Sequence, residues 1–278
     1  EIADGDWSSD VCSSDLIEHP AFRVRAARRD PFDGIFLTHA HVGHYLGLAL
    51  LGNEGTGIRD VPVWCTRRMA DFLRSNGPWS LMVEQGRIVP RVLEPAGPGP
   101  VDADEGWHRV DELLEVKALR VPHRDEYTDT VAFVFRRGGT VPGPAPSAGE
   151  SRPGAGARPD AAADPGRPGR SLLYLPDIDG WDAWERDVAE VVGSVDVALL
   201  DATFHSADEL PGRPEDDIPH PLVSRTMERL QDAVDRGTRV ILTHLNNSNP
   251  LVDEDGPEAR AVRERGFEVA REGTRIGL

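Results

Sequence analysis

Three histidines within six residues constrain this chain more than any other feature of its sequence. Residues 39–44 read HAHVGH and follow the apolar run FDGIFLT over 32–38. That run predicts a buried strand whose end delivers side chains to the edge of a sheet. Strand side chains alternate, so His39 and His41 point to the same side, and a following turn can bring His44 towards them. Neutral imidazoles bind Zn, Fe, Mn or Ni, so the pattern indicates a metal site.

Apolar runs and amphipathic stretches alternate along the rest of the chain. The apolar runs predict strands over 61–65, 113–121, 130–136, 171–175, 195–200 and 239–243. Helices are expected to begin over 45–51 and to cover 67–75, 221–235 and 257–265, with a closing hairpin-like pair over 267–278. This alternation, with polar residues at the strand ends, predicts an α/β layered fold.

The net charge of the chain indicates which kinds of molecule it can bind. The chain carries 31 Lys and Arg against 48 Asp and Glu, a formal net charge of -17. Such a balance supplies no broad basic surface, so we expect a small-molecule substrate rather than a nucleic acid. No apolar run approaches the ~18 residues that a membrane span requires, so no membrane partner is expected. Two cysteines form no disulfide framework, which favours a reducing, cytoplasmic location; the oligomeric state stays open.

The first sixteen residues, EIADGDWSSDVCSSDL, have neither helix nor strand periodicity and no signal-peptide core. From Asp6 to Leu16 they resemble the translation of a common sequencing-library adapter. We therefore expect 1–16 to be an adapter-derived artefact and 17–278 to form one domain, with native N-terminal strands missing; the alternative is a natural disordered N-terminus. Residues 1–16 hold five acidic and no basic residues, so the remainder would carry -12.

Residues 138–170 differ in kind from their surroundings. Of these 33 residues, 7 are Pro, 8 are Gly and 7 are Ala. Such a segment cannot bury enough apolar surface to offset the entropy of ordering it. We predict a disordered insertion rather than a linker between domains, because strand patterns flank it closely.

The HxHxxH pattern resembles the HxHxDH motif of the metallo-β-lactamase superfamily. The resemblance implies a four-layer αββα sandwich and further ligands at later strand ends, and His123, Asp177 and His244 stand at such ends. It implies one metal site formed by His39, His41 and His123. It implies a second site formed by His44, Asp177 and His244, with Asp177 bridging the metals.

One departure from that motif concerns the second site. The superfamily's aspartate is Gly43 here. The resemblance therefore implies a weakened second site and either one or two metal ions, with Asp179 or Asp201 as possible replacements.

A narrower resemblance is to the pyrroloquinoline quinone biosynthesis protein B family. VWCT over 63–66, HLNNSNP over 244–250 and GFEVA over 266–270 look like that family, and the match covers roughly 32–278. The family's own HxHxxH is degraded, whereas all three histidines are present here. The chain thus looks like a relative that keeps hydrolase-type ligands rather than a dedicated member of the quinone pathway.

A further pair of residues fits proton transfer. DATF over 201–204, together with His220, resembles loops of the ribonuclease Z branch, which implies that Asp201 and His220 shuttle a proton near the leaving group. The alternative is an ordinary strand end and a helix cap. Cys65 lies in an apolar run, which favours a core role over a nucleophilic one.

These resemblances imply a metal-dependent hydrolase with one or two Zn²⁺ ions, or Fe or Mn in their place. Metal-bound hydroxide would attack an ester, amide or phosphodiester. Asp177 would orient the water, and His220 or Asp201 would protonate the leaving group. Two alternatives stay open: iron-dependent oxidation of a tyrosine-derived precursor, as the quinone-biosynthesis resemblance allows, and a non-catalytic binding relative.

Overall fold

The computed structural model describes residues 32–52, 58–138, 171–212 and 218–271, together with residues 55, 214, 274, 276 and 277. Their contacts divide the chain into two compact units. Unit 1 runs to Gly97 and includes Ala118–Phe133 and Ile178–Trp184; unit 2 comprises Pro98–Lys117, Val134–Asp177 and the chain from Glu185 onwards. The expected adapter segment 1–16 and all of the expected insertion beyond Gly138 lie outside the described residues, and the expected loss of native N-terminal strands stays a prediction.

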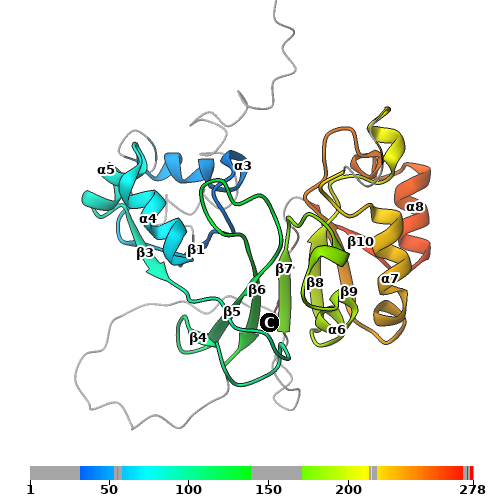
Figure 1. Ribbon diagram of the computed structural model, residues 1–278, viewed down its shortest axis with the longest axis horizontal. Helices are drawn as coiled ribbons and strands as arrows, with labels where there is room; N and C mark the ends of the chain where they lie inside the picture. The colour runs from blue at the N-terminus through cyan, green and yellow to red at the C-terminus, as the bar shows by residue number, and fades with distance from the viewer. Residues whose placement is uncertain are drawn as a thin grey trace, which may run out of the picture. The chain divides into compact units, whose positions relative to one another are not determined.

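Unit 1 is built on a short parallel sheet. Strands β1 (Ile35–Phe36), β2 (Val61–Cys65) and β3 (Ile88–Val92) lie in that order. Helices α4 (Arg67–Ser75) and α5 (Trp79–Glu84) pack against each other and against β3 (Figure 1). Both helices turn apolar side chains towards the sheet, and the fully buried core there includes Val63, Cys65, Met69, Leu73 and Ile88. Removing these side chains from water is the main stabilising contribution within unit 1.

The helix expected over 45–51 takes a different form. A one-turn helix, α3 (Val42–Tyr45), leads into the 3₁₀ helix η2 (Leu46–Leu51). Gly43, Gly47 and Gly52 fall within or beside this stretch, and glycine disfavours a continuous α-helix by roughly 1 kcal/mol per residue. The expected strand over 32–38 is likewise shorter, because only residues 35 and 36 form the ladder. Leu37 and Thr38 then carry the chain to His39.

Unit 2 is built on a seven-stranded sheet with the order β10-β9-β8-β7-β6-β5-β4. Strands β7 (Ser171–Leu175), β8 (Val197–Asp201), β9 (Arg239–Thr243) and β10 (Glu268–Val269) are parallel, whereas β4 (His108–Arg109) is antiparallel to β5 (Leu114–Arg120). The division between the units falls within β5 and β6 (Val131–Arg137).

Helices accompany the parallel strands of unit 2. Helix α6 (Val188–Gly193) packs against α7 (Val223–Asp235), α7 contacts β9, and α8 (Pro257–Glu264) contacts β10 (Figure 1). Three 3₁₀ helices complete the described elements: η3 (Trp181–Ala183) in unit 1, and η4 (Ala207–Glu209) and η6 (Pro250–Val252) in unit 2. Within the described ranges, no helix is long and apolar enough to cross a bilayer.

The parallel register of unit 2 positions its polar residues. Leu175 pairs with Leu200, and Asp201 pairs with Thr243, so β7, β8 and β9 end at the same edge of the sheet. Asp177, Asp201 and His244 stand at or just beyond those ends, where α/β sheets place their ligands.

The end of the chain differs from the expected hairpin-like pair. Among the described residues after Phe267, only β10 is a strand, and it runs parallel to β9. The connection passes through α8, and Gly266, with φ +84°, makes the turn into β10. A strand–helix–strand connection of this kind yields a parallel pair, because the helix returns the chain to the starting end of the sheet.

Candidate metal centres

Unit 1 brings three of the predicted metal ligands together. The Nδ1 atom of His41 lies 3.0 Å from Nε2 of His39 and 3.1 Å from Nε2 of His123. His39 is 1% exposed and the side chain of His123 also 1%, while His41 stands at the more open side with 20%. Three ring nitrogens therefore converge from two segments that are far apart in the sequence.

Each of these histidines is held through its other ring nitrogen. Nδ1 of His39 lies 3.0 Å from the hydroxyl of Thr38, within hydrogen-bond distance. Nδ1–H of His123 donates to Asp179 at 2.7 Å. Nε2–H of His41 donates to Glu126 at 3.0 Å, and this bond lowers the pKa of the Glu126 carboxyl. Partners of this kind fix the tautomer and orientation of a metal-binding imidazole.

The spacing of the three nitrogens fits one ion. Two nitrogens bound to a tetrahedral Zn²⁺ at about 2.0–2.1 Å lie roughly 3.3 Å apart, close to the separations between these histidines. All three nitrogens also lie within 4.8 Å of one another. The donor set, its spacing and its supporting hydrogen bonds therefore fit a transition-metal ion.

His44 lies on α3, and its ring is tilted by 40° against that of His39, with 4.2 Å between the ring centroids. It belongs to neither group of possible metal ligands found among the described residues. Its predicted role as a second-site ligand stays a prediction. At Gly43 an added Cβ would meet nothing within 4 Å, so crowding does not explain the missing aspartate.

Unit 2 gathers a second group at the edge of its sheet. Asp177, Asp201, His220 and His244 place their possible ligand atoms within 4.8 Å of one another. Asp177 is 4% exposed and Asp201 is fully buried. Two carboxylates buried this close together repel each other, and a cation or protonated partners must offset their charge. The group thus has both the donors and the charge that suit a metal ion.

Thr203, which had no predicted role, is at the centre of this group. Its hydroxyl donates to Asp201 at 2.7 Å and lies 3.1 Å from Nδ1 of His220 and 2.9 Å from Nδ1 of His244. Its backbone amide also donates to Asp201, at 2.9 Å. The side chain that follows β8 by two residues therefore links three members of the group.

The predicted proton-shuttle pair is in direct contact. Nδ1 of His220 lies 2.8 Å from Oδ2 of Asp201. Burial acts to raise the pKa of Asp201, but hydrogen bonds and charge from His220 and His244 outweigh it and hold the pKa below its ordinary value. Asp201 is therefore a buried carboxylate that accepts hydrogen bonds in its charged form.

The structure shows the surroundings of two further residues that the sequence had singled out, Asp179 and Cys65. Asp179 bonds to His123 within unit 1, which is the position of a supporting residue. Cys65 is fully buried, and burial raises the pKa of its thiol to about 12, as expected of a core side chain rather than a nucleophile.

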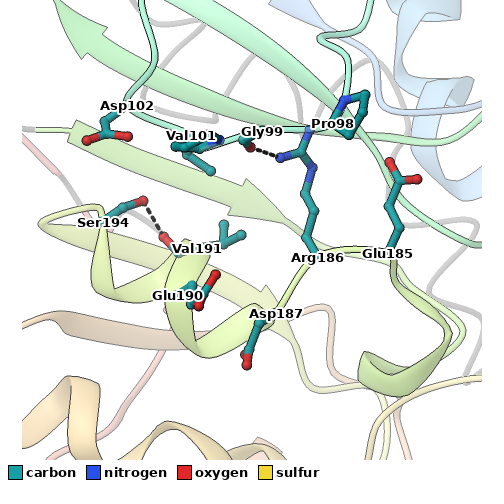
Figure 2. A pocket seen from close by; sticks show the side chains of 11 residues that line it. Pro98, Gly99, Val101, Asp102, Glu185, Arg186, Asp187, Glu190, Val191 and Ser194 are labelled. Carbon is teal, nitrogen blue, oxygen red and sulfur yellow. Dashed lines mark hydrogen bonds between the residues drawn. The ribbon is translucent and has the colours of Figure 1, made fainter.

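A hollow in unit 2 lies apart from this chemistry. It is formed by the 98–102 loop and by residues 185–194, and Figure 2 shows Arg186 reaching across it to the carbonyl of Gly99. Carboxylates line much of it, at Asp102, Glu185, Asp187 and Glu190. None of the predicted site residues lines it, so it carries no functional assignment.

Comparison of the sequence with known families gives a consistent result. The β-lactamase superfamily domain matches residues 11–142. Coenzyme PQQ synthesis protein B from Cupriavidus necator is 33% identical over 275 residues, which cover 95% of this chain and 79% of that protein. The Stutzerimonas stutzeri protein of the same name is 27% identical, over 99% of this chain and 84% of its own length. The Methylococcus capsulatus protein of that name is 33% identical over 118 residues, and there the match spans only 37% of its length.

Solved structures share the fold. The Zn²⁺-bound PqqB from Methylobacterium extorquens superposes with a TM-score of 0.63 at 17% identity, over 94% of this chain and 81% of that one. Unliganded yeast PDE1 superposes with a TM-score of 0.50 at 13% identity, over 87% of this chain and 68% of that one. The predicted metallo-β-lactamase-type α/β fold is confirmed.

Proposed function

This chain belongs to the coenzyme PQQ synthesis protein B family of the β-lactamase superfamily, and on that premise we propose that it is a metal-dependent enzyme acting on a small molecule in coenzyme PQQ synthesis. One observation carries the proposal. His39, His41 and His123 turn one nitrogen each towards a common point, within 3.0–3.1 Å of the nitrogen of His41. Histidines with a purely structural role are not expected to direct three ring nitrogens at one point.

The residues of unit 1 have distinct roles in this proposal. A bound Zn²⁺-type ion supplies Lewis acidity and lowers the pKa of a water ligand towards about 7. His39, His41 and His123 bind that ion, while Asp179 and Glu126 hold two of the rings in the binding tautomer. In unit 2, the Asp201–His220 hydrogen bond suits transfer of a proton at Nδ1 of His220.

Hydrolysis is the chemistry that unit 1 supports best. Three histidines with one open position form the ligand set of zinc sites that activate water. A neutral ligand set leaves the ion its full positive charge, which favours polarisation of an ester, amide or phosphodiester oxygen.

Oxidation is the second candidate, and a separate observation favours it. The unit 2 group combines two histidines with carboxylates, and two histidines with one carboxylate are the ligands of many non-haem iron oxygenases. Iron-dependent oxidation of a tyrosine-derived precursor is the form that this candidate takes.

A single variant tests the proposal. His41→Ala removes the nitrogen that both neighbours approach, so we expect loss of one bound metal ion per chain and a fall of activity to background. Activity is measured as ester, amide and phosphodiester hydrolysis, and as oxygen uptake with a tyrosine-derived substrate, to separate the two candidates. His108→Ala, on β4 outside both groups, is the matched control. Full activity in metal-free His41→Ala protein would refute the proposal.

A further inference from the structure

We propose that Thr128 is a positioning residue for the unit 1 centre formed by His39, His41 and His123. Its buried hydroxyl holds the backbone between His39 and His41, and so sets where these two imidazoles lie relative to His123. The inference rests on the proposed function, because it concerns the same metal centre, yet it is tested by metal binding rather than by turnover. Thr128 had no predicted role.

The amide of Ala40 is the group through which Thr128 acts. Ala40 stands between His39 and His41 and is 2% exposed, and its amide donates to Oγ1 of Thr128 at 2.9 Å. Thr128 is also 2% exposed and lies 88 residues further along the chain. A buried amide without an acceptor destabilises the folded state, so this bond favours one position of the Ala40 backbone. His39 and His41 are joined directly to Ala40, so the bond restricts both of them.

The same two segments are also joined by a backbone hydrogen bond. The amide of Val131 donates to the carbonyl of Thr38 at 3.1 Å. Two residues beyond Thr38, the acceptor for Ala40 is the side chain of Thr128 rather than a backbone carbonyl. The segment that carries His39 is therefore tied to residues 128–131 on both sides of this histidine.

Asp129 anchors the backbone on which Thr128 stands. Its Oδ1 accepts the hydroxyl hydrogen of Thr66 at 2.6 Å, and Thr66 caps the N-terminus of α4. Its Oδ2 pairs with Arg120, at the end of β5, at 3.0 Å. This pairing offsets the charge of a carboxylate that is only 6% exposed. Thr128 is thus mounted on a segment that is fixed independently of Ala40, as positioning requires.

One loop therefore acts on the unit 1 centre in three ways. Residues 122–130 contribute the ligand His123, and Glu126 of the same loop lies 3.0 Å from Nε2 of His41. Thr128 adds the bond to the backbone next to His41. Loss of the Thr128 hydroxyl should let that backbone shift relative to His123, although no ligand and no ring partner is removed. The expected effect is a weaker centre with an altered geometry.

Two substitutions of the same shape in this loop test the inference. Thr128→Val removes the acceptor of the Ala40 amide. Thr130→Val is the matched control, because Thr130 is 3% exposed and its hydroxyl has no hydrogen-bond partner among the described residues. Co²⁺ is titrated into each metal-free full chain against a chromophoric chelator. We expect Thr128→Val to weaken Co²⁺ binding at the unit 1 centre about 10-fold, at the low end of the range for residues that orient ligands, and Thr130→Val to leave it unchanged.

Further readouts separate positioning from a general loss of stability. Thr128→Ser, which restores the hydroxyl, should restore the affinity. The visible absorption of bound Co²⁺ depends on the geometry of its ligands and should change in Thr128→Val. Any Co²⁺ binding left in His41→Ala should not respond to Thr128→Val. If circular dichroism shows that Thr128→Val does not fold, Thr128→Ala, which leaves room for a water molecule at the Ala40 amide, replaces it.

Two results would overturn the inference. One is a folded Thr128→Val protein with the Co²⁺ affinity and absorption of wild type. The other is an equal loss of affinity in Thr130→Val, because the hydrogen bond to Ala40 would then not be its cause. Failure of the proposed function has a separate signature: wild type binds Co²⁺ and Thr128→Val binds it more weakly, which supports the inference, yet wild type turns over no substrate.

Discussion

Each of the three histidines in unit 1 directs one ring nitrogen at the other two histidines and has a hydrogen-bond partner at its second ring nitrogen. The holding groups differ: a hydroxyl for His39, an exposed carboxylate for His41 and a half-exposed carboxylate for His123. A carboxylate increases the basicity of the imidazole it binds, and so strengthens the metal bond. The three rings are thus held in place by their own hydrogen bonds, and Glu126 is the most solvent-exposed of the three partners.

Glu126→Gln tests that support. The variant keeps the shape of the side chain but loses the charge that accepts Nε2–H of His41. We expect metal affinity at this centre to fall about 10-fold, at the low end of the usual range because Glu126 is 48% exposed. Competition with a chromophoric chelator measures the affinity. Asp125→Asn, the neighbouring carboxylate that pairs with Arg68, is the control, and equal affinities in both variants would show that Glu126 plays no orienting part.

The sequence indicated the three candidate ligands of unit 1 but not the residues that support them. His39 and His41 follow a strand at alternating positions, and His123 also follows an apolar run, so their pattern was visible. The role of Glu126 could not be predicted, because Glu126 lies 85 residues from His41 in the sequence and in a loop without periodicity. Thr203 was hidden for a related reason, since a hydroxyl two residues beyond a strand is common and only folding brings His220 and His244 to it.

Elements with strong periodicity agreed with prediction to the residue. The strands over 61–65, 171–175 and 239–243 and the helix over 67–75 are as expected. Strand β3 was missed because it contains Pro90 and Arg91, which break the apolar run. Helices α5 and α6 were missed because six residues are too few for a clear helical period. β10 was assigned to a hairpin because residue patterns do not give strand direction.

A bidentate ion pair joins strand β10 to β9, and it makes the stability of this sheet edge depend on pH. Arg239 donates to Glu268 at 2.6 and 2.7 Å, and this bonding holds the pKa of Glu268 below its ordinary value. The folded state therefore binds fewer protons at Glu268 than the unfolded chain does. Its stabilising contribution is present above the ordinary carboxyl pKa and is lost as pH falls through the lowered one.

Glu268→Gln should therefore destabilise the chain by about 0.5–1 kcal/mol at pH 7, a small amount because both side chains are 40% or more exposed. The difference from wild type should be smaller at pH 3 than at pH 7, because the ion pair is lost as the pH falls through the lowered pKa of Glu268. Urea unfolding at both pH values measures it, with Glu264→Gln at the exposed end of α8 as the control. A difference that is unchanged at pH 3 would exclude the ion pair as its source.

The two units alternate along the chain, and each contains its own group of histidines. Unit 1 holds His39, His41 and His123, whereas unit 2 holds Asp177, Asp201, His220 and His244. The sequence pattern indicated one domain over 17–278, which stays a prediction, as do the adapter origin of 1–16, the insertion over 138–170 and the bridging role of Asp177. Family membership was predictable because it depends on short motifs near strand ends. The role of Thr203 in unit 2 was not predictable, because it depends on how the strand ends come together in the fold.

Anomalous X-ray diffraction from crystals of the zinc-loaded protein tests the central claim most directly. Data collected on both sides of the zinc absorption edge identify the ion by element and position. We predict a peak at about 2.0–2.1 Å from Nε2 of His39, Nδ1 of His41 and Nε2 of His123. A protein that holds zinc elsewhere, with no peak among these three nitrogens, would contradict the account.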